Sequence, residues 1–368
     1  MTWSGECVEG IANGRGNLAW RLYDSGEWRE ENYTGALKVG VPHGKGVFVW
    51  SNGDRYEGDI KNGKFHGSGI YLAADGSSYR GEFRNDKMHG HGSLTWKNGD
   101  RYEGEYKDGL RNGRGVFINT IGDRYDGEFK NGKISGKGVL VLNIGERHEG
   151  NFKNGKISGK GVIVFENGDR YEGSFKDGLF HGRGIVTNLK GDRYEGDYRN
   201  NLRHGQGVSV WASGGQYTGG YRNDVKHGHG KQVWVDGSRY VGGYKEGEPH
   251  GRGIFIEANG DRYEGEYRKG KQDGRGVWVS NNGDRYVGEF RNDLMNGHGV
   301  YRFHNGNLCE GEWRNGGLLG TGKGIADGEP TECYANKKLI WFKNQGEPKN
   351  MASRGMFSDY EFKFSKLA

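Results

Sequence analysis

Long apolar runs, cysteine and proline are all scarce in this sequence. No apolar run approaches the ~20 residues that a membrane-spanning helix needs, and the first residues, MTWSGECVEG, lack the basic and apolar segments of a secretory signal. The three cysteines, Cys7, Cys309 and Cys333, are odd in number and far apart, which favours a reducing compartment. We therefore expect a soluble intracellular protein whose membrane contacts are peripheral.

The composition also argues against disorder and against nucleic-acid binding. Only 4 prolines occur, and aromatic residues make up 13% of the chain, whereas disordered chains are poor in aromatics. The formal net charge is +6, a small excess in a chain that is 28% charged. A nucleic-acid-binding protein needs a clustered basic face, so we expect no nucleic-acid partner.

Glycine, by contrast, is abundant and regularly spaced. The chain has 73 glycines in 368 residues, about three times the usual share. A glycine that follows a Tyr-x pair, or its equivalent, recurs every 23 residues, at Gly35, Gly58, Gly81, Gly104, Gly127, Gly150, Gly173, Gly196, Gly219, Gly242, Gly265, Gly288 and Gly311. Collagen is excluded, because its glycines fall at every third position. A strict period of this length indicates a repeat array that forms one quasi-one-dimensional body.

This register divides the chain into three parts. Residues 1–34 hold a first, degenerate unit that is lengthened by seven residues, which we place in a loop within 19–32. Residues 35–324 hold thirteen units in strict register, and residues 325–368 depart from the repeat. The last part is therefore expected to be a cap or tail.

Each unit contains two strand-like runs separated by turns. Residues 100–107 alternate aromatic and charged side chains, which is the period of a strand with one buried face. Residues 46–50 form a second run that is rich in β-branched and aromatic residues. Asn-Gly or Asp-Gly pairs such as Asp108-Gly109 predict tight hairpin turns. We therefore predict an all-β fold, an elongated single-layer antiparallel sheet of consecutive 23-residue β-hairpins.

The repeated aromatic and glycine positions predict the core. A tyrosine stands two residues before most repeat glycines and a second large apolar residue two residues after them. The glycine between them leaves a notch where a neighbouring aromatic ring can lie against the backbone. The predicted core residues include Tyr56, Gly58, Tyr102, Gly104, Tyr106, Gly113, Gly115, Tyr171, Gly173 and Phe175.

These positions resemble the MORN repeat (membrane occupation and recognition nexus), whose pattern is Y-x-G-x-[WYF]-x-x-G-x-x-x-G-x-G. The matching residues in one unit are Tyr171, Gly173, Phe175, Gly178, Gly182 and Gly184, and the resemblance covers roughly residues 3–324. Near-pure arrays of this kind are found among cytoskeletal scaffolds of protists and among ciliary proteins, where they resemble rods that dimerise near membranes. The repeats also occur beside phosphatidylinositol phosphate kinases and a lysine methyltransferase, but no catalytic domain follows here. The resemblance implies a scaffold.

Enzymatic, cofactor and metal chemistry find little support in the sequence. The G-x-G-x-V motif recurs in many units without the other motifs of a kinase, so we interpret it as structural. We therefore expect no enzyme activity and no cofactor. Histidines recur at one position of the repeat, about 10 Å apart in successive units, which is too far to share an ion. Weak metal candidates remain where two histidines lie close together, at His89 and His91 and at His227 and His229. Surface histidines beside turns are the simpler interpretation.

Two features bear on lipid or partner binding. Arginine often stands three residues before the repeat glycine, as at Arg101, but an acidic residue flanks nearly every one, so only a weak contact with anionic lipid is expected. Residues 208–250 depart from the pattern, since acidic positions become neutral there. We consider this stretch a patch for a partner or a lipid headgroup, formed by Trp211, Arg222, Lys226, His227, His229 and Trp234. The alternative is sequence drift on a tolerant scaffold.

The C-terminal part contains two apolar patterns outside the repeat. We expect these residues to cap the open end of the sheet or to form a dimer or partner contact. They are Ile340, Trp341, Phe342, Tyr360, Phe362 and Phe364.

Taken together, these features favour a non-enzymatic scaffold that makes protein–protein contacts at a cytoskeletal or membrane-proximal structure in the cytoplasm. We expect a homodimer, because a single-layer sheet has a thin core, and cytoskeletal or ciliary protein partners. One alternative is a phosphoinositide-binding peripheral module or a regulatory subunit of a lipid-modifying enzyme. Another is a component of the ciliary axoneme, similar to a radial-spoke part.

Overall fold

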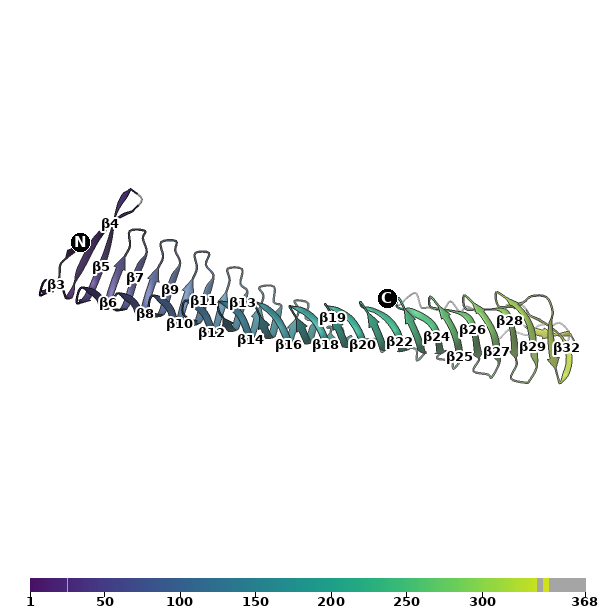
Figure 1. Ribbon diagram of the computed structural model, residues 1–368. Coiled ribbons are helices and arrows are strands. Elements are labelled where there is room, and N and C mark those ends of the chain that lie inside the picture. The colour runs from purple at the N-terminus through teal and green to yellow at the C-terminus, as the bar shows by residue number, and fades with distance from the viewer. Residues whose placement is uncertain (25, 336–339, 344–368) are drawn as a thin grey trace. The chain divides into compact units, whose positions relative to one another are not determined.

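The computed structural model describes residues 1–24, 26–335 and 340–343. The chain divides into two compact units, Met1–Leu179 and a second that begins at Phe180. Both are built from strands, as Figure 1 shows. None of the helices in the described residues is long and apolar enough to cross a membrane.

Unit 1 is a run of antiparallel strands in chain order. After the short strands β1 (Thr2–Trp3), β2 (Cys7–Val8) and β3 (Ile11–Ala12), it contains β4 (Gly14–Asp24), β5 (Glu27–Lys38), β6 (Val41–Val49), β7 (Arg55–Lys61), β8 (Lys64–Leu72), β9 (Ser78–Arg84), β10 (Lys87–Thr95), β11 (Arg101–Lys107), β12 (Leu110–Ile118), β13 (Arg124–Lys130), β14 (Lys133–Val141), β15 (Arg147–Lys153), β16 (Lys156–Val164) and β17 (Arg170–Lys176). From β4 onward each strand pairs with the next.

Unit 2 repeats this arrangement. It contains β18 (Leu179–Thr187), β19 (Arg193–Arg199), β20 (Leu202–Val210), β21 (Gln216–Arg222), β22 (Val225–Val233), β23 (Arg239–Lys245), β24 (Glu248–Ile256), β25 (Arg262–Arg268), β26 (Lys271–Val279), β27 (Arg285–Arg291), β28 (Leu294–Arg302), β29 (Leu308–Arg314), β30 (Gly317–Leu318), β31 (Gly322–Ala326), β32 (Glu329–Ala335) and β33 (Ile340–Phe342). Consecutive strands again pair antiparallel. The predicted all-β array of hairpins is thus confirmed.

The N-terminal insertion differs from the expectation. Residues 19–32 were predicted to contain a loop, but most of them extend strands β4 and β5, so that Trp20 pairs with Glu31 and Tyr23 with Trp28. The extra length therefore forms a longer hairpin, which reaches beyond its neighbours in unit 1 (Figure 1). Added residues that continue both strands of a hairpin keep their backbone groups hydrogen-bonded.

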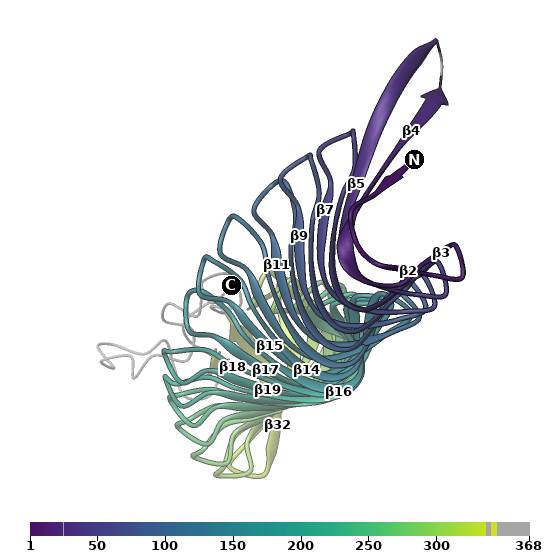
Figure 2. The ribbon, with the colours of Figure 1, turned by 90° about the vertical axis from the view of Figure 1, so that its left-hand side faces the viewer.

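In most hairpins the repeat glycine lies opposite a second glycine on the next strand. Gly104 on β11 lies opposite Gly115 on β12, and the register shifts by a bulge between Gly104 and Tyr106. In the connecting turn, Asp108 and Gly109 have φ angles of 51° and 86°. Asp, Asn and Gly tolerate this left-handed region best, which explains the recurrent Asn-Gly and Asp-Gly pairs. Figure 2 shows that each strand of unit 1 bends strongly along its length.

The core occupies one side of the sheet, which we call the tyrosine face. Tyr102 is completely buried there, and its ring lies edge-to-face with Tyr106 and Phe129 at centroid distances of 5.2 and 4.9 Å. Its hydroxyl donates to the carbonyl oxygen of Glu105 at 3.0 Å. Pairs of this geometry add about 0.5–1.5 kcal/mol beyond the burial of their area. Repetition of this contact builds a continuous aromatic core in each unit.

The predicted contact between aromatic rings and glycine notches is present. In most repeats the tyrosine two residues before the repeat glycine supplies the ring. A Cβ placed on Gly58 would lie 2.6 Å from the hydroxyl oxygen of Tyr56, and one on Gly69, across the hairpin, would also meet Tyr56. The tyrosine therefore folds along its own strand and covers both glycines.

Aspartates connect successive repeats. Asp54 accepts a hydrogen bond from the backbone nitrogen of Ala74 at 2.8 Å, and Asp100 accepts one from that of Thr120 at 3.0 Å. In both cases the acceptor lies four residues before the repeat glycine, and the donor lies in the turn of the next 23-residue repeat. These bonds hold adjacent turns together at the edge of the sheet.

Candidate functional site

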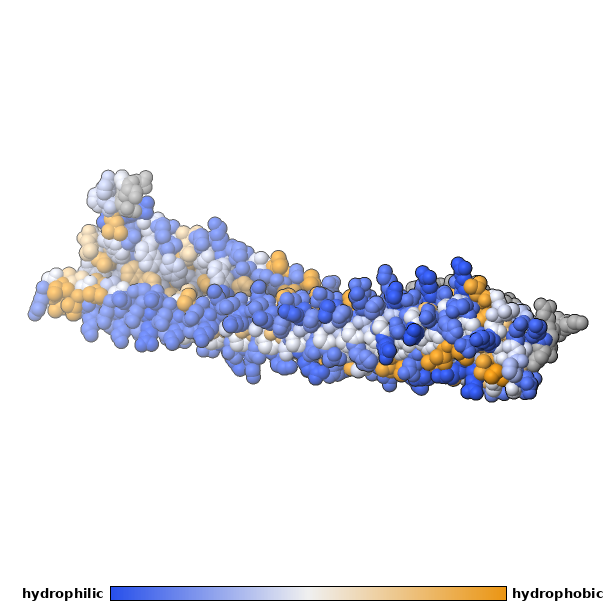
Figure 3. All heavy atoms as spheres, turned by 45° about the vertical axis from the view of Figure 1, so that its right-hand side comes forward, coloured by the Kyte–Doolittle hydropathy of each residue, from blue (hydrophilic) through white to orange (hydrophobic). Residues whose placement is uncertain are grey.

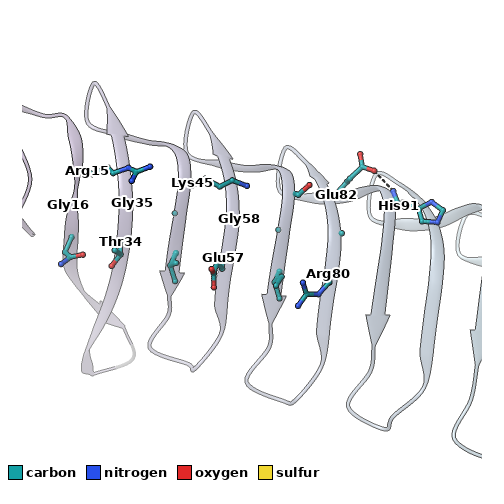
Figure 4. A pocket seen from close by; sticks show the side chains of 17 residues that line it. Arg15, Gly16, Thr34, Gly35, Lys45, Glu57, Gly58, Arg80, Glu82 and His91 are labelled. Carbon is teal, nitrogen blue, oxygen red and sulfur yellow. Dashed lines mark hydrogen bonds between the residues drawn. The ribbon is translucent and has the colours of Figure 1, made fainter.

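The opposite side of the sheet, which we call the charged face, carries a shallow groove in each unit. In unit 1 the groove has a volume of about 960 Å³ and its floor is a row of glycines that includes Gly35 and Gly58. Figure 4 shows Arg15 and Lys45 on one side of this row and Glu57 on the other. Because a glycine has no side chain, the backbone forms the floor, and the flanking residues decide what the groove can bind.

Six of the nine arginines that stand three residues before a repeat glycine are neutralised within their own strand. Each of the six pairs with an acid two residues later. The pairs are Arg55–Glu57 at 2.5 Å, Arg124–Asp126 at 2.9 Å, Arg147–Glu149 at 2.5 Å, Arg170–Glu172 at 2.6 Å, Arg193–Glu195 at 2.5 Å and Arg262–Glu264. The pairs are partly exposed, so each adds little stability, but together they cancel the basic stripe.

The groove of unit 2 is lined by more apolar side chains than that of unit 1, whose apolar side chains are Val47 and Ile70. It has a volume of about 820 Å³, and its apolar residues are Val241, Ile254, Val277, Val287 and Val300. Val241 and Val287 remain 36% and 37% exposed. We call these five residues the valine row. Much of the surface visible in Figure 3 is hydrophilic, and exposed apolar side chains that lie side by side are candidates for partner binding.

The valine row also removes acids from the charged face. Val241 and Val287 occupy positions that hold Glu57 or Glu172 in other repeats. Arg239 and Arg285, two residues earlier, therefore lack the acid that neutralises their counterparts and are exposed. Unit 2 thus combines apolar side chains with unneutralised cations on one face.

On the tyrosine face, β20–β23 are unusually polar. The amino group of Lys226 lies over the rings of Trp211, Tyr217 and Tyr244, at 5.4, 4.8 and 5.9 Å from their centroids. It donates to the side-chain oxygen of Gln232 at 2.7 Å. Burial lowers the pKa of Lys226 to about 8, and the nearby charge of Arg203 adds to this effect.

Arg203 occupies the same position one repeat earlier. Its guanidinium lies over Tyr194 and Tyr221, at 5.5 and 5.0 Å, and pairs with Asp224 at 3.2 Å. A third cation at this position, Arg111, lies over four rings, with Phe129 the nearest at 5.2 Å. Sequence reasoning did not single out Arg111 or Arg203. A basic residue at this position could have been noticed in the sequence, because the position is apolar in most repeats.

The six residues predicted to form one patch are not brought together. Trp211 and Lys226 meet on the tyrosine face. Trp234 lies edge-to-face with Phe255, 5.7 Å away. His229, in contrast, lines the groove of the charged face, and Arg222 is exposed. The sheet separates these side chains because neighbouring residues of a strand point to opposite faces.

The histidine pairs do not belong to a larger cluster of metal-binding side chains in the described part of the chain. Within residues 1–24, 26–335 and 340–343 no group of three or more His, Cys, Asp or Glu side chains could hold a metal ion. His89 instead accepts a weak hydrogen bond from the backbone nitrogen of Asp108 at 3.5 Å, and His43 accepts one from Asn62 at 3.4 Å. His43 and His89 therefore contact the turn of the following repeat, whereas the Nδ1 atoms of His66, His181 and His204 are buried without a hydrogen-bond partner.

The C-terminal residues continue the sheet beyond the last repeat. Ile340, Trp341 and Phe342 form β33, which pairs with β32, and Phe342 packs on Phe303 with centroids 5.9 Å apart. Tyr360, Phe362 and Phe364 lie outside the described residues. A disulfide joins Cys309, where other repeats have tyrosine, to Cys333. The scattered cysteines did not indicate this bond, because strand pairing brings together residues far apart in sequence.

A family model agrees with this repeated geometry along most of the chain. The MORN repeat model matches thirteen consecutive segments, 33–55, 56–78, 79–101, 102–124, 125–147, 148–170, 171–193, 194–216, 217–239, 240–262, 263–285, 286–308 and 309–323. The chain therefore belongs to the MORN repeat family. Each matched segment begins at the tyrosine position, and all but the last end just before the next one. No curated protein matches the chain in sequence.

Solved structures show only a remote likeness. The TCP domain of SAS-4 (dCPAP) from Drosophila melanogaster, solved with a proline-rich motif of Ana2 (dSTIL), is 15% identical, with 42% of this chain and 85% of that chain covered and a TM-score of 0.27. Virginiamycin B lyase from Staphylococcus aureus is 11% identical, with 68% and 89% covered and a TM-score of 0.13. Scores this low carry no conclusion about fold or function.

Proposed function

We propose that this protein is a non-enzymatic scaffold that binds protein partners along the charged face of its repeats, at a cytoskeletal or membrane-proximal structure. The observation that carries the proposal is the valine row, an apolar strip left uncovered along the groove of unit 2. Exposed apolar strips with polar rims are typical of protein-binding surfaces. Membership of a repeat family adds support, because repeat proteins present extended binding surfaces.

The test places charge on the valine row. The double variant Val241→Glu with Val287→Glu is expected to fold, because other repeats carry glutamate at these positions, as at Glu57 and Glu172. The control, Val49→Glu with Leu72→Glu, adds the same charge at unit 1 residues that are 41% and 40% exposed. Tagged proteins are expressed in cells, and their partners are identified by cross-linking mass spectrometry.

We expect cross-links between partners and residues 229–300 to be lost in the valine-row variant and kept in the control. The same cross-linking experiment tests homodimerisation, because it detects cross-links between two copies of the chain as well as cross-links to other proteins. If the valine-row variant retains every partner, the proposed binding surface is wrong.

A peripheral lipid-binding role is the second candidate. It is supported by Arg239 and Arg285, which lack the neighbouring acid of other repeats and lie beside exposed valines. Basic residues contribute about 1 kcal/mol each to binding of anionic membranes. We expect Arg239→Glu with Arg285→Glu to abolish co-sedimentation with phosphoinositide-containing vesicles at about 0.15 M salt.

The matched control for lipid binding reverses two neutralised arginines. Arg170 and Arg193 pair with Glu172 and Glu195, so Arg170→Glu with Arg193→Glu makes the same change in net charge. Equal losses in both variants would indicate a non-specific charge effect. Failure of the natural protein to sediment with the vesicles would rule out the lipid role.

A further inference from the structure

Two arginines of unit 2 lie directly opposite each other. Arg285 on β27 is paired in register with Arg302 on β28, and both side chains are exposed on the charged face. Like charges directly opposite each other in an antiparallel pair of strands are destabilising. Among the residues that the structure describes, no carboxylate forms an ion pair with either arginine. The hairpin therefore carries two cations that no ion pair of the described chain neutralises.

Two departures from the repeat create this arrangement. Arg302 stands where every other registered repeat has an apolar or β-branched residue, such as Leu72, Ile118 or Val279. Val287 stands where other repeats carry the acid that neutralises the arginine two residues earlier. Both departures raise the positive charge of one hairpin at a cost in stability. They therefore favour a role in binding an anionic ligand over a role in folding.

The arginine pair borders the valine row. Val277, Val287 and Val300 lie directly opposite one another on β26, β27 and β28. Val287 and Val300 stand two residues from Arg285 and Arg302 on their own strands, so these four side chains share the charged face. A ligand that fits this surface must present anionic groups beside apolar ones.

The relative lengths of these side chains favour a protein segment over a membrane. Apolar residues of peripheral membrane proteins reach about 5–10 Å into the boundary between headgroups and acyl chains, so they must project further than the basic residues around them. Here the order is reversed, because valine is short, arginine is long, and the valines line a groove. The arginines would meet the lipid phosphates and keep the valines away from the acyl chains.

We propose that the hairpin of β27 and β28 binds an acidic, amphipathic segment of a protein partner. Carboxylates of this segment pair with Arg285 and Arg302, and its apolar side chains pack on Val277, Val287 and Val300. Arginine suits this role because its planar guanidinium donates two parallel hydrogen bonds to one carboxylate. Binding also relieves the repulsion between the two arginines. The inference rests on the proposed scaffold function and adds the chemistry of the partner.

The test selects ligands without assuming their sequence. The purified full-length chain is used to select binders from a display library of short random peptides, and the affinity of the selected peptides is measured by fluorescence polarisation. We expect these peptides to be rich in Asp or Glu and in Leu, Ile or Phe. Their binding should weaken severalfold when the salt concentration rises from about 0.05 M to about 0.5 M, because salt screens exposed charge pairs.

A double variant removes the two charges with residues that the repeat already accepts. Arg285→Gln introduces the residue found at the equivalent position as Gln216, and Arg302→Val introduces the one found as Val279. The variant is therefore expected to fold. We expect it to bind the selected peptides at least about tenfold more weakly than the natural chain, because it loses two charge-assisted contacts.

The matched control is Arg147→Gln with Arg170→Gln. It makes the same change in net charge at arginines that already pair with an acid of their own strand, and it should leave peptide binding unchanged. Selected peptides without acids would overturn the inference, as would peptides that bind the double variant as tightly as the natural chain. A library that yields no binder would also overturn it.

Vesicles that contain phosphatidylserine distinguish a membrane from a protein segment. If the double variant loses sedimentation with these vesicles but keeps its affinity for the peptides, the arginine pair binds a membrane and the inference is wrong. The proposed function is tested separately by the partners that Val241→Glu with Val287→Glu loses in cells. Partners that bind the valine row through neutral or basic segments would support that function and contradict this inference.

Discussion

The ring of Tyr102 lies directly over Gly115 on the neighbouring strand of the same hairpin. A Cβ placed on Gly115 would come within 2.4 Å of the tyrosine hydroxyl oxygen and 2.5 Å of the ring carbon that bears it. Contacts this short cannot form without displacement of the buried ring. The pairing of tyrosine and glycine is therefore the steric basis of the repeat, and the same contact recurs between Tyr125 and Gly138 and between Tyr263 and Gly276.

Gly115→Ala should consequently destabilise the protein by about 1–3 kcal/mol through overpacking. The measurement is urea unfolding followed by circular dichroism. A double-mutant cycle with Tyr102→Leu identifies the cause, because alanine should cost much less once the ring is absent. Additive losses would contradict the steric explanation.

Lys226→Met should stabilise the protein at pH 7, on the order of 1–2 kcal/mol, since loss of the buried charge outweighs loss of the cation–π contacts. The gain should shrink as the pH rises. The pKa of Lys226 is about 8 in the folded protein, against 10.5 as its ordinary value. The unfolded chain therefore binds more protons between these values, and the stability of the natural protein increases with pH there.

The measurement compares urea unfolding of the natural protein and the variant at pH 7 and pH 9.5. Burial raises the pKa of tyrosines such as Tyr240 and Tyr244, which destabilises the fold only above about pH 10. This effect is common to both proteins and cancels in the comparison. A constant difference between pH 7 and pH 9.5 would show that Lys226 titrates normally.

Asp284→Ala should cost about 1–3 kcal/mol, because it leaves buried donors without an acceptor. Asp284 is 3% exposed and accepts from the backbone nitrogen of His304 at 2.9 Å and from the hydroxyl of Tyr301 at 3.2 Å. The control is Asp261→Ala at the equivalent position. Asp261 is partly exposed and accepts a hydrogen bond from the backbone nitrogen of Asn281 at 2.8 Å. Urea midpoints should fall further for Asp284→Ala, and the reverse order would refute the role of burial.

Cys333→Ser should loosen the C-terminal strands and leave unit 1 unchanged. The disulfide from Cys309 closes a loop with a sequence separation of 24 residues, which corresponds to about 3 kcal/mol of stabilisation in chain-entropy terms. Hydrogen exchange should become faster in β31 and β32, with Cys7→Ser, an exposed free cysteine, as the control. Unchanged exchange would mean that strand pairing alone holds these residues.

Much of the fold could be predicted because its contacts are local and periodic. Each strand of a repeat pairs with the next strand in the chain, so the 23-residue spacing, the Asp-Gly turns and the alternation around Tyr102 were sufficient to predict the hairpins. The direction of the tyrosine ring was not predictable in this way. The alternation within one strand does not specify that this ring covers both Gly104 and Gly115.

The candidate sites were harder to predict because they depend on which face a side chain occupies. The stretch around Lys226 and Trp211 was recognised from its departure from the pattern, but His229 was placed with them and lies on the charged face. The valine row was missed, because its members come from different repeats and are adjacent only across strands.

The sequence by itself determined the strand class, the repeat register and the family, because the glycine and tyrosine positions act within single hairpins. Only the tertiary structure decided which charges are neutralised, which buried cation has no carboxylate beside it among the described residues, and which cysteines form a disulfide. Arg55 and Glu57 cancel because they share one face, whereas Lys226 is exceptional only because three rings and no carboxylate surround it. Those relationships depend on distances across strands, which a linear pattern does not contain.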